Sequence, residues 1–402
     1  MQSPDEHPRV DRTPRRTVLV AALLAALLSF AVKLPQWGFT HKEPDELVYW
    51  QLAQRLWQDG VYSLRGTLVF ERVLQPVAAS MYDHPAFHHP PLFAALLGPF
   101  AAGDASPYPP ASALIVPWLF HALFCAATVA LGLRLARARA DRVALVLAVA
   151  AVVLDPFGWF ASRFLWIDAL PMGCAAAAMW CALGASSRKR LFAAGTFAAL
   201  AGLAKLTGLV VLPFVVLLRL RAARREHHVR DLALLVAPSV VLVGAWLVWF
   251  ANATGAVLPT WLAPTDAILA RDELMRGAFE RSPLALLGSM ALFQPLVFVV
   301  GVAFAVRPSD LADRARGVVL AWFVVGAALV LATAVLGATP MLTRQLTAVV
   351  PALYALAVAV VVERRAPLWR IAFAACVALA AITGWTSVHG TSVYELAAFF
   401  AR

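Results

Sequence analysis

The sequence predicts an all-α protein, a polytopic transmembrane helical bundle of about eleven crossings whose first outer loop carries interfacial helices. Of the 402 residues, 61% are hydrophobic and only 14% are charged, and the mean hydropathy is +0.75. A soluble domain carries about 25% charged residues. Apolar runs close to the roughly 20 residues that cross a bilayer recur along the whole chain. We therefore expect one membrane domain over residues 1–402.

Basic residues gather in the short gaps between the apolar runs, which sets the orientation of the bundle. The gaps read "RLARARADR" (134–142), "SSRKR" (186–190), "RLRAARREHHVR" (219–230) and "ERRAPLWR" (363–370). Loops of this kind stay in the cytoplasm. The net charge of +11 is thus explained by topology, and the pattern argues against a nucleic-acid partner. The basic N-terminus is expected inside.

The expected spans follow in order from this orientation. The first is read as an uncleaved helix rather than a signal peptide, because many spans follow it. The apolar runs lie at 17–35, 112–133, 143–162, 168–186, 191–204, 206–218, 232–251, 284–306, 317–337, 345–362 and 371–387. The runs at 191–204 and 206–218 are either two short tilted helices or a re-entrant hairpin. The C-terminus is then outside.

Two long segments are expected on the outer face, a first loop at 36–111 and a second at 252–283. Any chemistry should take place on this face. Within the first loop, Pro44 suits the first turn of a helix and Gly60 suits the position that ends one. Asp45 and Glu46 complement the helix dipole in that first turn.

This short helix carries tryptophans on one stripe, with Leu47, Trp50 and Trp57 among its members. Such a helix beside a span is expected to lie flat at the membrane surface. Asp45 and Tyr49 are four residues apart and share another face. The alternative is that the two acids only cap an interfacial helix.

Further polar residues recur at the outer edges of the spans. Pro90 and Pro91 force an extended turn that places His88 and His89 where the chain re-enters the membrane. Charges at membrane depth usually face a polar cavity or a partner. The charged residues of this kind are Arg163 and Asp168 in "SRFLWIDALPM", Lys205 in "GLAKLTGLVVLP" and Arg344 in "TPMLTRQLTAVVP".

Each group also has a purely structural explanation. Lys205 may be a lysine that extends to a lipid headgroup, and Arg163 with Asp168 a pair at a span end. His84 with the two neighbouring histidines lacks the Cys or acidic partners of a zinc site. His121 is expected to be a packing residue, and the four cysteines lie within apolar runs.

These stretches together resemble the C-type (GT-C) glycosyltransferase superfamily, in particular its bacterial branch related to aminoarabinose transferases and protein O-mannosyltransferases. The matching features run in the family's order over residues 43–355. They are Asp45, Glu46 and Tyr49 after the first span, Pro90, Pro91 and Leu92, Arg163 with Asp168, Lys205, and Arg344 in "TRQLTAVVPAL".

The resemblance implies transfer of a sugar from a polyprenyl-phosphate-linked donor to a lipid, glycan or protein acceptor on the outer face of the bacterial inner membrane. Asp45 would be the catalytic base, Glu46 would orient a neighbour, and Asp168 would be the second acid. Tyr49, His88, His89, Arg163, Lys205 and Arg344 would bind the donor phosphate or the substrate. No metal or other cofactor is expected, although a divalent cation is not excluded.

Two departures argue against the aminoarabinose substrate. His89 stands where that branch has a lysine, and Gln345 stands where it has a tyrosine. The alternatives are a transporter or flippase, and an outer-face ligase or polymerase of lipid-linked glycans. A transporter would show two matching halves with broken helices, whereas this chain has one interruption, near Lys205.

Overall fold

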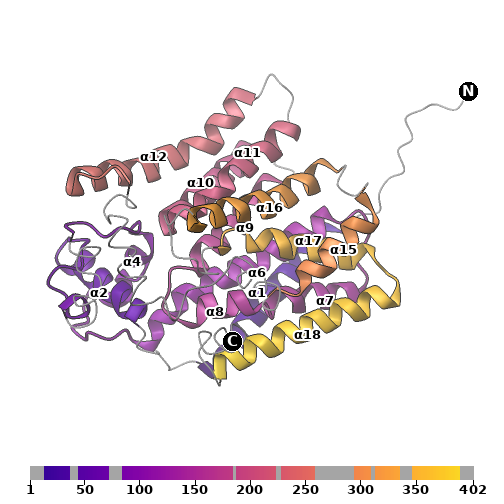
Figure 1. Cartoon of the computed structure of the whole chain (residues 1–402), viewed down its shortest axis with the longest axis horizontal. Helices are drawn as coiled ribbons and strands as arrows, with labels where there is room; N and C mark the ends of the chain where they lie inside the picture. The colour runs from indigo at the N-terminus through magenta and orange to yellow at the C-terminus, as the bar shows by residue number, and fades with distance from the viewer. Residues whose placement is uncertain are drawn as a thin grey trace, which may run out of the picture.

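A computed structural model describes residues 13–36, 44–71, 84–183, 187–222, 228–258, 294–308, 313–335 and 346–389. Over these residues the protein is all-helical, as predicted (Figure 1). The α-helices are α1 (Arg15–Ala31), α2 (Pro44–Gln58), α4 (Leu92–Leu96), α5 (Gly98–Ala101), α6 (Ile115–Leu135), α7 (Arg142–Val153), α8 (Pro156–Arg163), α9 (Ala169–Ala182), α10 (Arg188–Ala204), α11 (Val211–Ala222), α12 (His228–Thr254), α15 (Leu296–Val306), α16 (Arg314–Val335), α17 (Val350–Glu363) and α18 (Pro367–His389). Three 3₁₀ helices join them, η1 (Leu34–Gln36), η3 (Ala111–Leu114) and η4 (Leu206–Val210).

Each predicted span contains a helix among its described residues, and most bounds differ by a few residues. The span expected at 143–162 is divided into α7 and α8, and the span expected at 284–306 contains α15, while its residues 284–293 lie outside the described part of the chain. By length and composition, four helical stretches are able to cross a membrane: Ala111–Leu135, Arg142–Arg163, His228–Thr254 and Pro367–Gly384. Shorter apolar helices cover Ala169–Ala182, Leu206–Leu220, Leu296–Val306 and Val350–Glu363. The number of crossings therefore stays a prediction.

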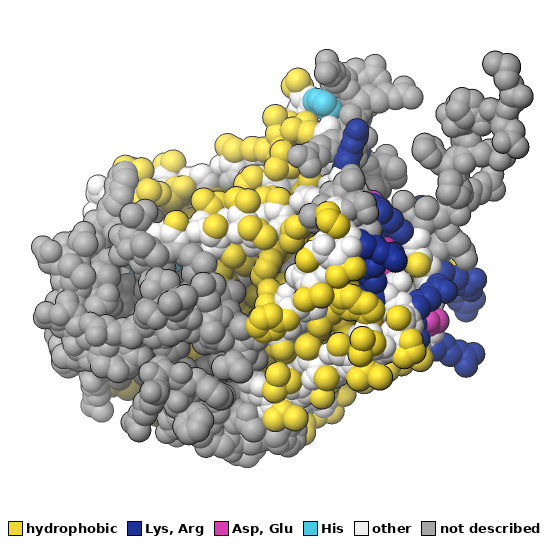
Figure 2. Space-filling view, turned by 45° about the vertical axis from the view of Figure 1, so that its right-hand side comes forward, with side chains coloured by type: hydrophobic (Ala, Val, Ile, Leu, Met, Phe, Trp, Pro, Cys, Tyr) yellow, Lys and Arg dark blue, Asp and Glu magenta, His cyan; other side chains and the backbone are white. Residues whose placement is uncertain are grey.

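Exposed apolar side chains cover the flanks of the bundle. On α1, Leu19 and Leu23 are 59% and 60% exposed, and on α12 Val240 is 64% exposed. Similar side chains cover α7, α15, α16 and α18, and Figure 2 shows them as a broad yellow surface. Soluble proteins rarely expose apolar patches of this extent, so this surface fits a lipid environment.

The interrupted region near Lys205 forms two antiparallel helices. At the start of α10, Arg190 donates a hydrogen bond to the carbonyl of Trp180 near the end of α9, at 3.2 Å. At the other end of α10, Lys205 reaches Asp168 at the start of α9. Helix α10 therefore runs the length of α9, and η4 with α11 turns back. Two short crossings and a re-entrant hairpin both remain predictions for this region.

Gly208 allows the tight turn after Lys205. A Cβ atom at this position would lie 2.2 Å from the carbonyl oxygen of Ala201, which is far inside van der Waals contact. Helix α11 then ends beside the first turn of α12, where Arg219 pairs with the buried Asp231 at 2.6 Å.

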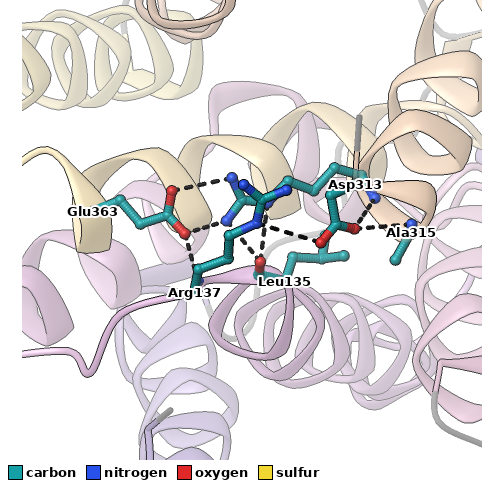
Figure 3. A network of polar contacts seen from close by, with 6 residues as sticks. Leu135, Arg137, Asp313, Ala315 and Glu363 are labelled. Atoms are coloured by element: carbon teal, nitrogen blue, oxygen red, sulfur yellow. Dashed lines mark hydrogen bonds and ion pairs between the residues drawn. The ribbon is translucent and has the colours of Figure 1, made fainter. Parts of the chain in front are cut away.

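The basic loops meet at one end of the bundle, as the topology predicts. Figure 2 shows Lys and Arg side chains gathered along this edge. The Arg316 guanidinium donates to the carbonyl of Leu135 at 2.8 and 3.0 Å and pairs with Glu363 (Figure 3). Arg137 pairs with Asp313 at 3.4 Å in the same network. The network joins the 134–142 loop to the start of α16 and to the end of α17.

The first outer loop lies at the opposite end, where Figure 1 shows α2 and α4 together. Its tryptophan stripe, expected at the membrane surface, is divided between covered and exposed side chains. Trp50 is fully buried and its indole donates to the carbonyl of Ser106 at 2.9 Å. Trp57 donates to the carbonyl of Ala95 at 3.2 Å but is 52% exposed. The later part of the same loop covers Trp50, which helical periodicity alone does not reveal.

The Arg316 network generates a stability prediction. Arg316→Met removes the partner of Glu363 and leaves an unpaired carboxylate in a mostly buried site, so we expect a loss of about 3 kcal/mol. The measurement is thermal unfolding in detergent. The matched control is Arg314→Met, an exposed arginine two residues earlier, with an expected change within about 0.5 kcal/mol. Equal losses in the two variants would contradict a structural role for the network.

Candidate functional site

The predicted site residues gather at the end of the bundle opposite the basic loops. One hydrophobic cluster contains buried residues from the segments with Asp45, the two histidines, Asp168 and Lys205: Tyr49, Phe87, Leu165, Ile167 and Ala204. Because these residues pack together, the first loop, the segment after α8 and the end of α10 form one unit. The convergence that topology only made possible is present for these segments.

The start of α2 is as the sequence predicts, with Pro44 as its first residue and Asp45 and Glu46 in its first turn. Gly60 follows its end with a positive φ of 69°. Glu46 is fully buried and accepts a hydrogen bond from the backbone N–H of Leu165 at 2.9 Å. Glu46 thus holds the segment after α8 against α2.

Asp45 and Tyr49 lie on another face of α2. The carboxylate residue Asp45 is half-buried, and Tyr49 is buried at 6% exposure. The Tyr49 ring packs edge-on against Phe93 at 5.3 Å between centroids and lies 6.4 Å from the His89 ring. The face shared by Asp45 and Tyr49 therefore meets the His-Pro-Pro element.

The His-Pro-Pro element is held by Tyr62. The backbone N–H of Phe87 donates to the carbonyl of Tyr62 at 2.9 Å, and the Tyr62 hydroxyl donates to the carbonyl of Pro90 at 3.1 Å. Burial raises the pKa of Tyr62, so its hydroxyl remains a donor at physiological pH. The rings of His88 and His89 are 4.3 Å apart and both residues are half-buried.

Asp168 and Lys205 form a buried ion pair. The Lys205 ammonium lies 2.9 Å from the Asp168 carboxylate, and their side chains are only 6% and 2% exposed. Lys205 ends α10 in an extended conformation, because the chain must turn there into η4. The sequence alone also allowed Lys205 to extend to a lipid headgroup. In the structure, Lys205 pairs with Asp168 instead.

Arg163 ends α8, five residues before Asp168. Its guanidinium lies 5.0 Å from the centre of the Phe164 ring, which stacks on Trp166 at 4.4 Å. Arg344, the other predicted phosphate ligand, lies outside the described residues, as does most of the predicted second outer loop. Among the described residues, no group of three or more His, Cys, Asp or Glu is arranged to hold a metal ion.

A second polar cluster was not anticipated from the sequence. Asp155 is fully buried at the break between α7 and α8, where it caps α8 by accepting from the N–H of Gly158 at 2.8 Å. Its carboxylate also accepts from the Tyr354 hydroxyl at 2.8 Å and from the Gln294 amide at 2.9 Å. The signal was Asp-Pro inside an apolar run, an N-cap followed by a first-turn proline.

The histidine expected to be a packing residue belongs to this region. His121 is fully buried, and its Nδ1 hydrogen-bonds to the Lys33 ammonium, which is itself 2% exposed. A Cβ atom on Gly158 would lie 2.5 Å from the other ring nitrogen of His121 and 3.1 Å from the Asp155 carboxylate. The glycine therefore lets α8 approach both side chains.

These contacts fix α8 from both ends. Asp155 and His121 hold its start, while the bond between Glu46 and Leu165 and the pair of Asp168 with Lys205 hold the segment after it. Arg163 lies between these attachments, on a helix that has little freedom to move.

Comparison with known proteins shows a shared fold. No protein-family model and no curated protein matches the sequence. Solved structures of the oligosaccharyltransferase from Archaeoglobus fulgidus do match, each at 13% identity. The apo form has a TM-score of 0.55 and is matched over 96% of this chain and 60% of its own. The form tethered to an acceptor peptide with the NVT sequon has a TM-score of 0.54, with 96% and 55% covered.

A third structure holds AglB from the same organism in complex with an inhibitory peptide and a dolichol-phosphate. Its TM-score is 0.51, and the match covers 96% of this chain and 59% of that chain. This chain thus has the fold of these glycosyltransferases over nearly all its length, while it spans little more than half of theirs.

The Asp168–Lys205 pair generates a prediction on stability. Lys205→Met strands a buried carboxylate, and we expect a loss of about 3–5 kcal/mol in thermal unfolding. The double variant with Asp168→Asn, which carries neither charge, should recover more than half of that loss. The control is Lys189→Met, an exposed lysine on the same helix. A Lys205→Met loss no larger than the control would mean that the pair is not desolvated.

A second prediction concerns the packing of α8. Gly158→Ala should destabilise the protein by about 1–3 kcal/mol, since the new methyl group overlaps His121. Gly244→Ala on α12, where nothing lies within 4 Å, should instead be neutral or stabilise by up to about 1 kcal/mol. Thermal unfolding of both variants makes the comparison, and the same response in both would show that His121 does not contact α8.

Proposed function

We propose that this chain is a membrane glycosyltransferase of the GT-C type, which transfers a sugar from a polyprenyl-phosphate-linked donor to an acceptor on the outer face of the membrane. The observation that carries the proposal is that the segments with Asp45, the His-Pro-Pro element, Asp168 and Lys205 contribute to one hydrophobic cluster, and that Asp168 and Lys205 form a buried ion pair. The fold shared with oligosaccharyltransferases supports it.

A lipid-linked donor is favoured by the side on which the acidic residues lie. Soluble nucleotide sugars are supplied in the cytoplasm, and the proposed site lies at the end away from the basic loops. One solved neighbour was determined with a dolichol-phosphate and another with an acceptor peptide. We propose a polyprenyl-phosphate donor by analogy, and keep lipid, glycan and protein as acceptor classes.

In this proposal Asp45 is the general base that takes the proton from the acceptor hydroxyl or amine. It is half-buried in the first turn of α2, next to the fully buried Glu46. Glu46 is a positioning residue, because its carboxylate already accepts from the N–H of Leu165. A positioned base contributes about 10²–10⁴-fold to the rate.

The leaving group is the phosphate of the lipid carrier, and basic side chains stabilise its developing charge. Lys205, Arg163 and Arg344 are the proposed cationic partners, with Tyr49, His88 and His89 beside them. Lys205 is held by Asp168, so we propose that Asp168 aims the ammonium and that the phosphate becomes a further partner of Lys205.

The proposed location is the bacterial inner membrane, with the N-terminus in the cytoplasm and the site on the outer face. The same proposal includes transfer of a hexose or a pentose. It also includes membership in the branch related to aminoarabinose transferases and protein O-mannosyltransferases. His89 and Gln345 argue for a sugar other than aminoarabinose.

The test is native mass spectrometry of the purified protein and its Asp45→Asn variant. We expect a polyprenyl-phosphate sugar to remain bound to the variant, because removal of the base leaves donor binding intact while turnover falls by about 10²–10⁴-fold. Glu71→Gln, which removes an exposed acid of the same loop, is the control and should behave as wild type. An unrelated solute with no polyprenyl lipid on either form would favour a transporter instead.

A further inference from the structure

Three segments that are distant in the chain meet at the basic end of the bundle. The hydroxyl of Thr13, two residues before α1, accepts a hydrogen bond from the N–H of Ala140 at 3.0 Å. The Arg365 guanidinium donates to the carbonyl of Arg139 at 2.9 Å. The start of α1, the loop between α6 and α7 and the loop between α17 and α18 therefore form one surface.

This surface carries a cluster of arginines, each within three residues of a contact that joins the segments. The members of this arginine cluster are Arg15, Arg16, Arg139, Arg142, Arg365 and Arg370. All are exposed except Arg370, which is half-buried. A guanidinium stays protonated at every physiological pH, so only nearby carboxylates can offset the charge of the cluster.

One carboxylate lies within the arginine cluster. Asp141 caps α7 by accepting from the N–H of Ala144 at 2.9 Å, and it pairs with Arg370. The hydrogen bond from Ala144 and the pair with Arg370 lower the pKa of Asp141, so this carboxylate stays ionised. Asp141 therefore offsets one of the six positive charges.

The other described acids at this end of the bundle have arginine partners outside the cluster. Glu363 and Asp313 belong to the network drawn in Figure 3, where they pair with arginines of that network. Asp231 pairs with Arg219 and Arg230. The arginine cluster thus keeps an excess of positive charge over the described acids.

Exposed apolar side chains begin directly beside the arginine cluster. On α7, Val143 follows Arg142, and Val146, about one turn later, is 68% exposed. On α18, Leu368 is 77% exposed and Ile371 is 65% exposed. Helices α7 and α18 pack against each other, and Figure 2 shows Lys and Arg side chains at the edge of the apolar surface. The cluster therefore lies where exposed charge meets a surface that suits lipid chains.

This combination distinguishes between classes of ligand. A guanidinium donates two parallel hydrogen bonds to phosphate oxygens. A soluble polyanion would use the arginines but would leave the neighbouring apolar side chains without a partner. A zwitterionic lipid carries an ammonium that offsets its phosphate, whereas a lipid with net negative charge is attracted by each Lys or Arg near the membrane surface. An anionic phospholipid matches both the charge and the apolar surface.

We propose that the arginine cluster binds the headgroup of an anionic phospholipid, whose hydrocarbon chains lie against the exposed apolar side chains of α7 and α18. The headgroup contacts arginines from more than one segment, so the bound lipid also links these segments. The cluster lies at the end of the bundle opposite Asp45, and the inference does not depend on the proposed glycosyl transfer.

The experiment measures binding of phosphatidylglycerol and phosphatidylcholine with identical acyl chains to the full chain in detergent, by native mass spectrometry. The test variant combines Arg16→Gln with Arg142→Gln, which removes two exposed charges and none of the hydrogen bonds or ion pairs described above. The matched control combines Arg188→Gln with Lys189→Gln, which removes two exposed charges at the start of α10, a helix that packs on α9 and α12.

We expect the wild type to bind phosphatidylglycerol at least about tenfold more tightly than phosphatidylcholine, because the headgroup charge is attracted by the cluster. The test variant should bind phosphatidylglycerol at least about fivefold more weakly than the wild type, and the control within about twofold of it. Inorganic phosphate should not displace the lipid, since it lacks the hydrocarbon chains.

Equal affinity of the wild type for the two lipids would overturn the proposal, and this comparison needs no variant. Equal weakening in the two double variants would show that only the overall charge of this end matters, and would also overturn it. Displacement of phosphatidylglycerol by inorganic phosphate would assign the arginine cluster to a soluble anion instead. None of these outcomes affects the donor lipid expected on Asp45→Asn.

Discussion

The cost of removing charge from water governs how this bundle is assembled. A buried charge is tolerated only when it is paired and hydrogen-bonded. Lys205 meets Asp168, Arg316 meets Glu363 and Arg219 meets Asp231, each between segments separated by turns or whole helices. Because apolar helices in lipid have little hydrophobic reason to prefer one neighbour over another, these pairs help to specify which helices lie together.

The paired charges divide into two groups with different consequences. At the basic end, the Arg316 network joins loops that the sequence places far apart, and it fixes the ends of helices α16 and α17 beside the 134–142 loop. At the other end, Asp168 pairs with Lys205, and Glu46 accepts a hydrogen bond from the N–H of Leu165. Acidic residues thus join α2 to the segment after α8, and this segment to the end of α10.

Helix α8 links the buried clusters with the proposed site. Asp155 caps its first turn, and Glu46 accepts a hydrogen bond from the N–H of Leu165, just after its end. The eight residues of α8 therefore connect the buried core with the outer loop. The proposal that Arg163 binds a phosphate relies on this support, because a charged group acts best when its position is fixed. The buried polar groups thus hold α8, which carries Arg163, at its start and just after its end.

The sequence determined the class of the fold and the two ends of the molecule. Apolar runs mark the parts of the chain that face lipid, and arginines mark the loops that face water on the inner side. These patterns predicted an all-helical chain with a basic inner end. They also predicted a first loop that carries an acidic helix from Pro44 to Gly60. The sequence also singled out the segments that carry Glu46, Tyr49, His89, Asp168 and Lys205, but that these segments pack together is known only from the structure.

Only the tertiary structure decided which of these groups are partners. Periodicity shows that the face of α2 with Trp50 is apolar, but not that a later part of the same loop covers it in place of lipid. Several hydrogen bonds join residues that are distant in the chain. Leu165 donates to Glu46, Tyr354 donates to Asp155, and Gln54 donates to the carbonyl of Asp104. Such contacts depend on how loops fold over helices, and the local pattern of a sequence does not carry that information.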